Sequence, residues 1–176
     1  MADPTYTVRR VSSVSDAQLD GLAAVLVDCV EGGASVSFML PLSHERARAF
    51  WSKVAADVTT GGRSLIIAED ANGIIGTVQV VLDQPENQPH RADISKMLVH
   101  QRARRLGVAA ALMVAAEDAA RIADKTVLVL DTASADADRL YTRLGWQLAG
   151  TIPDYALLPG GGLCDTRYYF RRLKPA

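Results

Sequence analysis

The chain has 176 residues, a formal net charge of −1 at pH 7, 49% hydrophobic residues and 22% charged residues. These values are typical of one globular domain, which we expect to cover residues 1–176, and they exclude a disordered chain. Because the charges are balanced, we expect no nucleic-acid partner. No apolar run approaches the roughly 20 residues that span a bilayer, so we expect no membrane partner. The N-terminus shows no signal-peptide pattern, and we therefore expect a cytoplasmic location.

The first half of the chain predicts a strand, two helices and a hairpin. The segment TYTVRRV (5–11) alternates β-branched and polar residues, as a half-buried strand does. Apolar residues then recur at three- and four-residue spacing until two glycines follow, so this helix should end near Glu31. A second helix should begin at the capping residue Ser43. The segments RSLIIAED and IIGTVQVVLD, joined by the turn ANG, predict a hairpin.

The second half predicts the rest of a mixed sheet. The strand ADISKMLVH runs directly into an alanine-rich helix, VLVLD predicts a short buried strand, and TASADADRLYTRLG predicts a helix closed by Gly145. WQLAGTI and TRYYFRRL are the expected final strands. The order β α α β β β α β α β β indicates an α/β fold with helices on both faces of the sheet and one right-handed crossover.

The segment VHQRARRLGVAAALM combines a strand end, a basic turn and a helix start. Unpaired N–H groups in a first helical turn and the helix dipole form an anion site, and Arg104 and Arg105 can neutralise phosphate charge. The alternative is a turn glycine, Gly107, beside solvated arginines. Neither GxGxxG after the first strand nor GxxxxGK[ST] is present, which disfavours dinucleotide and ATP binding.

The same segment resembles the acyl-CoA motif [QR]xxGx[GA] of the GNAT N-acetyltransferase superfamily, with Arg104, Gly107 and Ala109 in register. The resemblance implies the GNAT-type mixed, largely antiparallel twisted sheet and acetyl-CoA as cosubstrate. It also implies direct transfer to an amine of a small molecule, such as an amino-acid-like toxin, an antibiotic or a metabolite.

The resemblance further implies which residues bind coenzyme A. The strand before the motif would pair its backbone with the pantetheine arm, and the turn would hold the pyrophosphate. The implied set is Met97, Leu98, Val99, Arg104, Arg105, Leu106, Gly107, Val108, Ala109, Ala110, Ser134 and Tyr141. Arg105 and Ala109 stand where the family often has glycine, and Ser134 stands where it often has asparagine.

The family pattern NxxAxxLYxxxGF is matched by SADADRLYTRLGW, which implies that Tyr141 is the general acid. A phenol, with an ordinary pKa of about 10, stays protonated at neutral pH and can donate to a thiolate. The alternative is a core aromatic residue. Asp131, at the end of VLVLD, is the expected second catalytic residue, orienting the acceptor ammonium or acting through water. Capping of the following helix is an equal alternative for Asp131.

A narrower resemblance, to the tabtoxin resistance protein and its relatives, rests on EGGASVSFM, LDT and GTIPDYALLPGGGL. It implies that the loop between the first two helices lines the acceptor site. The expected substrate-binding residues are Glu31, Gly33, Ala34, Ser35, Val36, Phe38, Asp131 and Tyr155. Their alternative roles are a helix stop, a serine cap and core packing.

Two rival functions remain open, a protein or peptide N-acetyltransferase and a non-catalytic acyl-CoA-binding module. Three scattered histidines give no spacing for a metal site, so we expect none. Cys29 and Cys164 lie in no motif that would activate a thiol, so we expect no acyl-enzyme. No interface signal is visible, and the chain could be a monomer or a homodimer.

Overall fold

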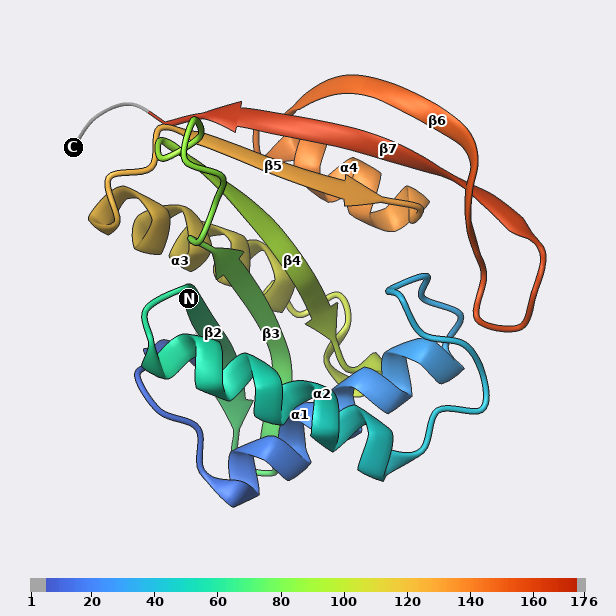
Figure 1. Ribbon diagram of the computed structural model, residues 1–176. Helices are drawn as coiled ribbons and strands as arrows, with labels where there is room; N and C mark the ends of the chain where they lie inside the picture. The colour runs from blue at the N-terminus through green and yellow to red at the C-terminus, as the bar shows by residue number, and fades with distance from the viewer. Residues whose placement is uncertain (1–5, 174–176) are drawn as a thin grey trace.

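The computed structural model describes residues 6–173, and the expected order of elements is confirmed (Figure 1). The elements are β1 Thr7–Val11, α1 Asp16–Glu31, α2 His44–Thr59, β2 Arg63–Asp70, β3 Gly73–Val81, β4 Arg91–Val99, the 3-10 turn η1 Gln101–Ala103, α3 Val108–Ile122, β5 Val127–Thr132, α4 Ala135–Arg143, β6 Gln147–Leu157 and β7 Leu163–Arg172. Thr5 of the first predicted strand and both ends of the expected 1–176 domain lie outside the described residues.

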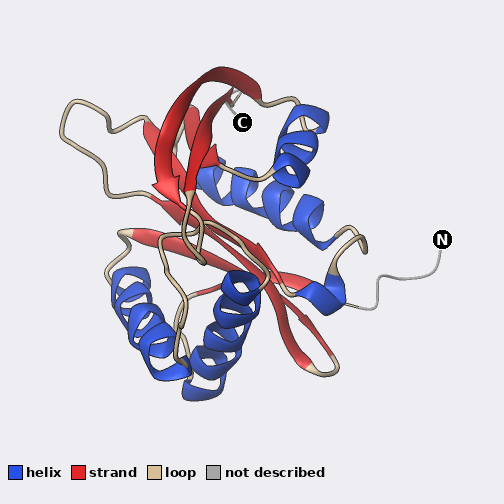
Figure 2. Cartoon of the chain, turned by 90° about the vertical axis from the view of Figure 1, so that its right-hand side faces the viewer, coloured by secondary structure: helices blue, strands red, loops and turns tan. Residues whose placement is uncertain are grey.

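The seven strands form one sheet in the order β1-β2-β3-β4-β5-β7-β6. Only β4 and β5 pair in parallel, across the crossover through α3; every other neighbouring pair is antiparallel. One apolar cluster joins the sheet to α3 and α4, and a second joins the opposite face to α1 and α2. Figure 2 shows helices on both faces of the sheet. The predicted mixed sheet with helices on both faces is therefore confirmed. No helix among residues 6–173 is long and apolar enough to cross a membrane.

The final hairpin is longer than the sequence predicts. Trp146 precedes the strand, and β6 continues through Pro153 to Leu157. Proline lacks a backbone N–H, but β6 is an edge strand, where one side of the backbone has no partner. The register with β7 also shifts between Ile152 and Ala156, so Pro153 lies in an irregular segment. The edge position thus permits a strand where the sequence suggested a loop.

Two irregularities of β4 shape the middle of the sheet. Gln79 of β3 lies opposite Ser95 and Thr77 lies opposite Leu98, so β4 contains a bulge between Ser95 and Leu98. Lys96, within the bulge, has a φ of 50°. The pairing of β4 with β5 ends at Asp93, and Figure 1 shows the carboxyl ends of the two strands diverging. A gap in the hydrogen-bonding ladder is thereby left between β4 and β5.

Candidate functional site

The basic turn before α3 has the backbone conformation of an anion site. Arg105 and Gly107 both adopt positive φ, 64° and 83°. Gly107 is the N-cap of α3 and accepts the first helical hydrogen bond from the backbone N–H of Ala111 at 3.1 Å. The N–H groups of residues 108–110 consequently have no acceptor within the helix. These donors and the helix dipole suit a phosphate group.

The arginines around this turn have different neighbours. Arg102 forms a salt bridge with Asp70 in the β2–β3 hairpin, and this contact lowers the pKa of the Asp70 carboxyl. The guanidinium of Arg104 lies against the end of α1: its Nη2 atom is 3.4 Å from the place where a Cβ on Gly32 would stand. Arg105 is exposed, as is Leu106. The side chain of Arg105 therefore reaches solvent at the mouth of the turn.

The second half of β4 has a free backbone edge toward β5. Leu98 and Val99 pair with Thr77 and Gly76 of β3, whereas no residue of β4 beyond Asp93 pairs with β5. Met97 and Val99 direct their side chains toward the α3 core, and Leu98 packs with the α1 and α2 core. The expected pantetheine-binding segment thus offers unpaired backbone groups beside the α3 turn.

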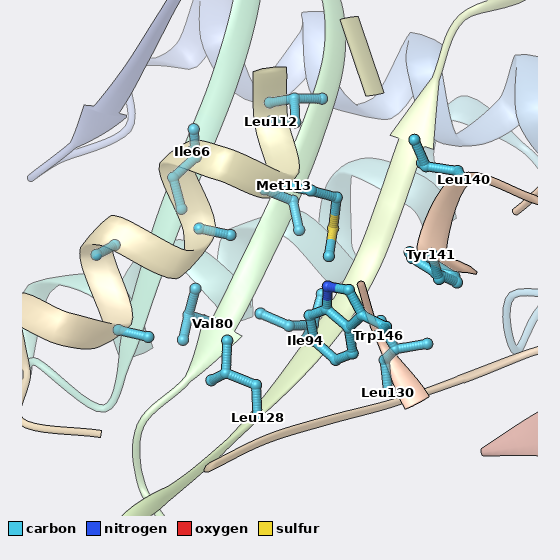
Figure 3. Close-up of a cluster of buried hydrophobic side chains, with 14 of the residues drawn as sticks. Ile66, Val80, Ile94, Leu112, Met113, Leu128, Leu130, Leu140, Tyr141 and Trp146 are labelled. Atoms are coloured by element: carbon cyan, nitrogen blue, oxygen red, sulfur yellow. The ribbon is translucent and has the colours of Figure 1, made fainter. Parts of the chain in front are cut away.

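Tyr141 lies on α4 with only 4% of its surface exposed. Its ring packs against Trp146 and Tyr169, at centroid distances of 6.0 and 5.8 Å. Figure 3 shows Tyr141 and Trp146 in the same buried cluster. Burial raises the pKa of the Tyr141 phenol above its usual value, and the negative charge of Asp131 raises it further. Tyr141 is a core aromatic residue, as one alternative held, and its hydroxyl is also protonated beside an acidic group.

Asp131 is exposed at the end of β5, and its Oδ2 atom accepts a hydrogen bond from Thr166 at 3.1 Å. The alternative that Asp131 caps the following helix is wrong, because the N-cap of α4 is Ser134. The Ser134 hydroxyl oxygen accepts from the backbone N–H of Ala137 at 3.3 Å. Its hydroxyl hydrogen is not used in that bond, so Ser134 can still donate to a ligand.

The loop between α1 and α2 is fastened to the hairpin of β6 and β7. Ser35 donates to the carbonyl of Leu157 at 3.0 Å, and the backbone N–H of Leu40 donates to the carbonyl of Pro159 at 2.9 Å. Cys164 also contacts the Ser35 hydroxyl, at 3.7 Å. Segments about 120 residues apart therefore meet over one end of the sheet, as Figure 1 shows.

The other expected acceptor residues differ in environment. Ala34, Val36 and Phe38 pack against the α1 and α2 core, and the Phe38 ring meets Phe50 edge-on at 5.3 Å. Core packing is thus part of their role. Glu31 is exposed at the end of α1. Gly33 has a φ of 87° and open space where a Cβ would stand.

Known proteins are similar to this chain in sequence and in fold. A family model described as an acetyltransferase (GNAT) domain matches residues 61–148, half of the chain, including the α3 turn and Tyr141. The chain belongs to the GNAT acetyltransferase family. It is accordingly an acetyl-CoA-dependent N-acetyltransferase, and the resemblance drawn from Arg104, Gly107 and Ala109 is confirmed at the level of the superfamily.

Solved structures share the fold of this GNAT acetyltransferase. An N-acetyltransferase from Staphylococcus aureus Mu50 is 17% identical with a TM-score of 0.79, and the match covers 96% of this chain and 99% of that one. The protein yncA from Salmonella typhimurium, solved with its cofactor acetyl-CoA, is 18% identical with a TM-score of 0.78 over 98% and 96% of the two chains. A ribosomal-protein-alanine N-acetyltransferase from Brucella melitensis is 21% identical with a TM-score of 0.79 over 95% and 99%.

Sequence reasoning missed two residues near Asp131 in this acetyltransferase, Tyr168 and Lys96. Tyr168 pairs with Asp131 across the sheet and donates to the Tyr155 hydroxyl at 2.8 Å. That hydrogen bond, with burial and the charge of Asp131, raises the pKa of Tyr168 to about 12. Lys96 is the other missed residue. Its position in a bulge depends on the pairing of β4 with β3, which residue spacing within β4 does not reveal.

Proposed function

We propose that this GNAT acetyltransferase moves the acetyl group of acetyl-CoA to the amine of a small amino-acid-like molecule, with Tyr141 as general acid. The observation that carries the proposal is the position of Tyr141. Its buried phenol is kept protonated near Asp131, and Asp131 is the second-last residue of β5, in the part of the strand that no longer pairs with β4. One end of the sheet thus offers a proton donor and a carboxylate.

The proposed binding of acetyl-CoA rests on unpaired backbone groups. The N–H groups at the start of α3 would hold the pyrophosphate, with Arg105 adding positive charge. Met97 to Val99 would pair with the pantetheine arm along the free edge of β4. The Ser134 hydroxyl would donate to the same arm, since its oxygen alone serves the helix cap.

The reaction would proceed by direct attack. The amine nitrogen bonds to the thioester carbonyl carbon, the carbon–sulfur bond breaks, and the sulfur takes a proton from the Tyr141 hydroxyl. Asp131 would accept a hydrogen bond from the acceptor's ammonium, which loses one proton to water before the attack. After the attack the nitrogen loses a second proton to water, and water reprotonates Tyr141, so that each turnover releases one proton. The raised pKa of Tyr141 does not oppose this transfer, because an apolar environment raises the pKa of the emerging thiol too.

Neither cysteine suits an acyl-enzyme route. Burial is the main cause that raises the pKa of the Cys29 thiol to about 11, so it is not a thiolate at neutral pH. Cys164 contacts the Ser35 hydroxyl in the loop between α1 and α2. Replacing both cysteines with alanine should therefore leave turnover largely intact.

The preference for a small acceptor rests on the covering of the site. The loop between α1 and α2 is hydrogen-bonded to the β6–β7 hairpin, and this bridge leaves less room for a long peptide than an open groove would. The fold alone does not determine which acceptor the enzyme uses. Similar structures include the ribosomal-protein-alanine enzyme and a candidate phosphinothricin N-acetyltransferase. A protein acceptor is therefore the alternative, and a role in toxin resistance stays a prediction.

The test is a turnover screen that follows release of free coenzyme A. Amino acids, amine metabolites and amine-bearing antibiotics are compared with peptides that have free N-termini or lysine side chains. We expect turnover with one or more small amines and little with peptides. Efficient turnover of peptides alone would transfer the assignment to a protein acceptor. Binding of coenzyme A without turnover of any amine would support the non-catalytic alternative.

A further inference from the structure

We propose that Lys96 binds a carboxylate of the acceptor, so that the substrate class is free α-amino acids and closely similar zwitterions. This inference rests on the proposed function. Lys96 lies in the bulge of β4, immediately before the segment Met97 to Val99. Bulges redirect a side chain relative to the regular alternation of a strand. Here the bulge turns Lys96 toward the α1–α2 side of the sheet, where its Nζ atom meets Ser37 at 3.2 Å.

The ammonium group of Lys96 has few partners. Besides Ser37, it stands over the ring of Phe50, 5.8 Å from the centroid. It forms no salt bridge with any residue in the described part of the chain. An ammonium has three hydrogens to donate, so the Ser37 contact leaves two without a strong acceptor. A partly buried cation in this state favours an anionic ligand, because such a ligand replaces the hydration that the ammonium has lost.

Charges around Lys96 match a zwitterion. Asp131, on the neighbouring strand β5, is the negative group whose field acts on Lys96, while Arg63 adds a second positive charge. Burial nevertheless lowers the pKa of Lys96, so the negative charge of Asp131 does not fully compensate the ammonium. An α-amino acid has an ammonium and a carboxylate on one carbon. Asp131 suits the first and Lys96 suits the second.

The same pairing of charges would exclude other amines. A peptide N-terminus has an amide carbonyl in place of the carboxylate, and a lysine side chain has no anion near its amine. Both would leave Lys96 without a counter-ion when they displaced water from the site. The free carboxylate is then the feature by which the enzyme selects its acceptor.

The experiment compares an accepted α-amino acid with its primary amide, which retains the amine and loses the anion. Both are assayed with the wild-type enzyme, with Lys96→Met and with Lys53→Met. Methionine retains most of the unbranched lysine stem, and Lys53 is an exposed lysine on α2, which makes it the matched control. Calorimetry with coenzyme A verifies that each variant is folded.

We expect the wild type to prefer the amino acid by roughly tenfold or more in kcat/KM, as a charge-assisted hydrogen bond implies. Lys96→Met should lose this preference, mainly through a higher KM for the amino acid, with the amide little affected. Lys53→Met should resemble the wild type. Equal use of acid and amide by the wild type, or an equal loss of both in Lys96→Met, would overturn the assignment of Lys96. Wild-type enzyme that acetylates no amine would instead contradict the proposed function.

Discussion

The hydroxyl of Tyr141 can be removed with little change in packing, and Tyr141→Phe therefore isolates its chemical role. The ring contacts with Trp146 and Tyr169, at 6.0 and 5.8 Å, remain in the variant. General acid catalysis contributes about 10²–10⁴-fold to rate, so kcat should fall by that factor, equivalent to about 3–5 kcal/mol in the barrier. Affinity for acetyl-CoA should change little, since the proposed grip on coenzyme A is mostly by backbone groups.

The assay measures kcat and KM for both substrates, together with the free energy of unfolding in urea. Tyr169→Phe is the control, because Tyr169 belongs to the same buried cluster but donates its hydroxyl hydrogen bond to Asp138. Loss of this hydrogen bond in Tyr169→Phe should lower the free energy of unfolding by about 1 kcal/mol and leave turnover near that of the wild type. Unchanged kcat in Tyr141→Phe, with a normal fold, would refute the assignment of Tyr141 as acid.

Three further outcomes are expected. Gly107→Ala should lower the free energy of unfolding by about 1–2 kcal/mol, because the φ of 83° at this position strains any residue with a Cβ. It should also weaken the binding of coenzyme A measured by calorimetry, because the start of α3 would shift. An unaltered affinity would contradict the proposed role of the turn. Glu117→Leu should lower the free energy of unfolding by about 2–4 kcal/mol. Glu117 is 6% exposed, and its carboxylate contacts the Trp146 ring nitrogen at 3.3 Å and Arg171 at 3.1 Å. A loss below about 0.5 kcal/mol would show that these contacts contribute little to stability. Lys96→Met should stabilise the fold at neutral pH, because burial lowers the pKa of Lys96 in the folded state. The Lys96 side chain of the unfolded chain then binds its proton more tightly than that of the folded protein, so the stability of the wild type rises with pH up to about 10.4. The stability difference between Lys96→Met and the wild type, measured by urea titration, should therefore shrink as the pH rises. A difference that widened with pH would contradict the lowered pKa.

The sequence by itself determined the order of the elements and the position of the basic turn before α3. Helix and strand periodicities depend on residues close together in the chain, as do capping residues such as Ser43. The position of Gly107 at the start of a helix could also be predicted, because the strand end, the turn and the helix start form one continuous segment of the sequence. Local chemistry was therefore sufficient for the order of elements, the two-faced sheet and the superfamily.

Tertiary structure alone decided the arrangement around Lys96, Asp131 and the loop between α1 and α2. The bulge that turns Lys96 exists only because β4 pairs with β3 out of step, and the gap beside Met97 exists only because β5 stops pairing at Asp93. Likewise, Ser35 meets Leu157, and Tyr168 meets Asp131, across long stretches of chain. Such contacts arise from the register between distant strands and from the packing of loops, which no spacing within one segment encodes.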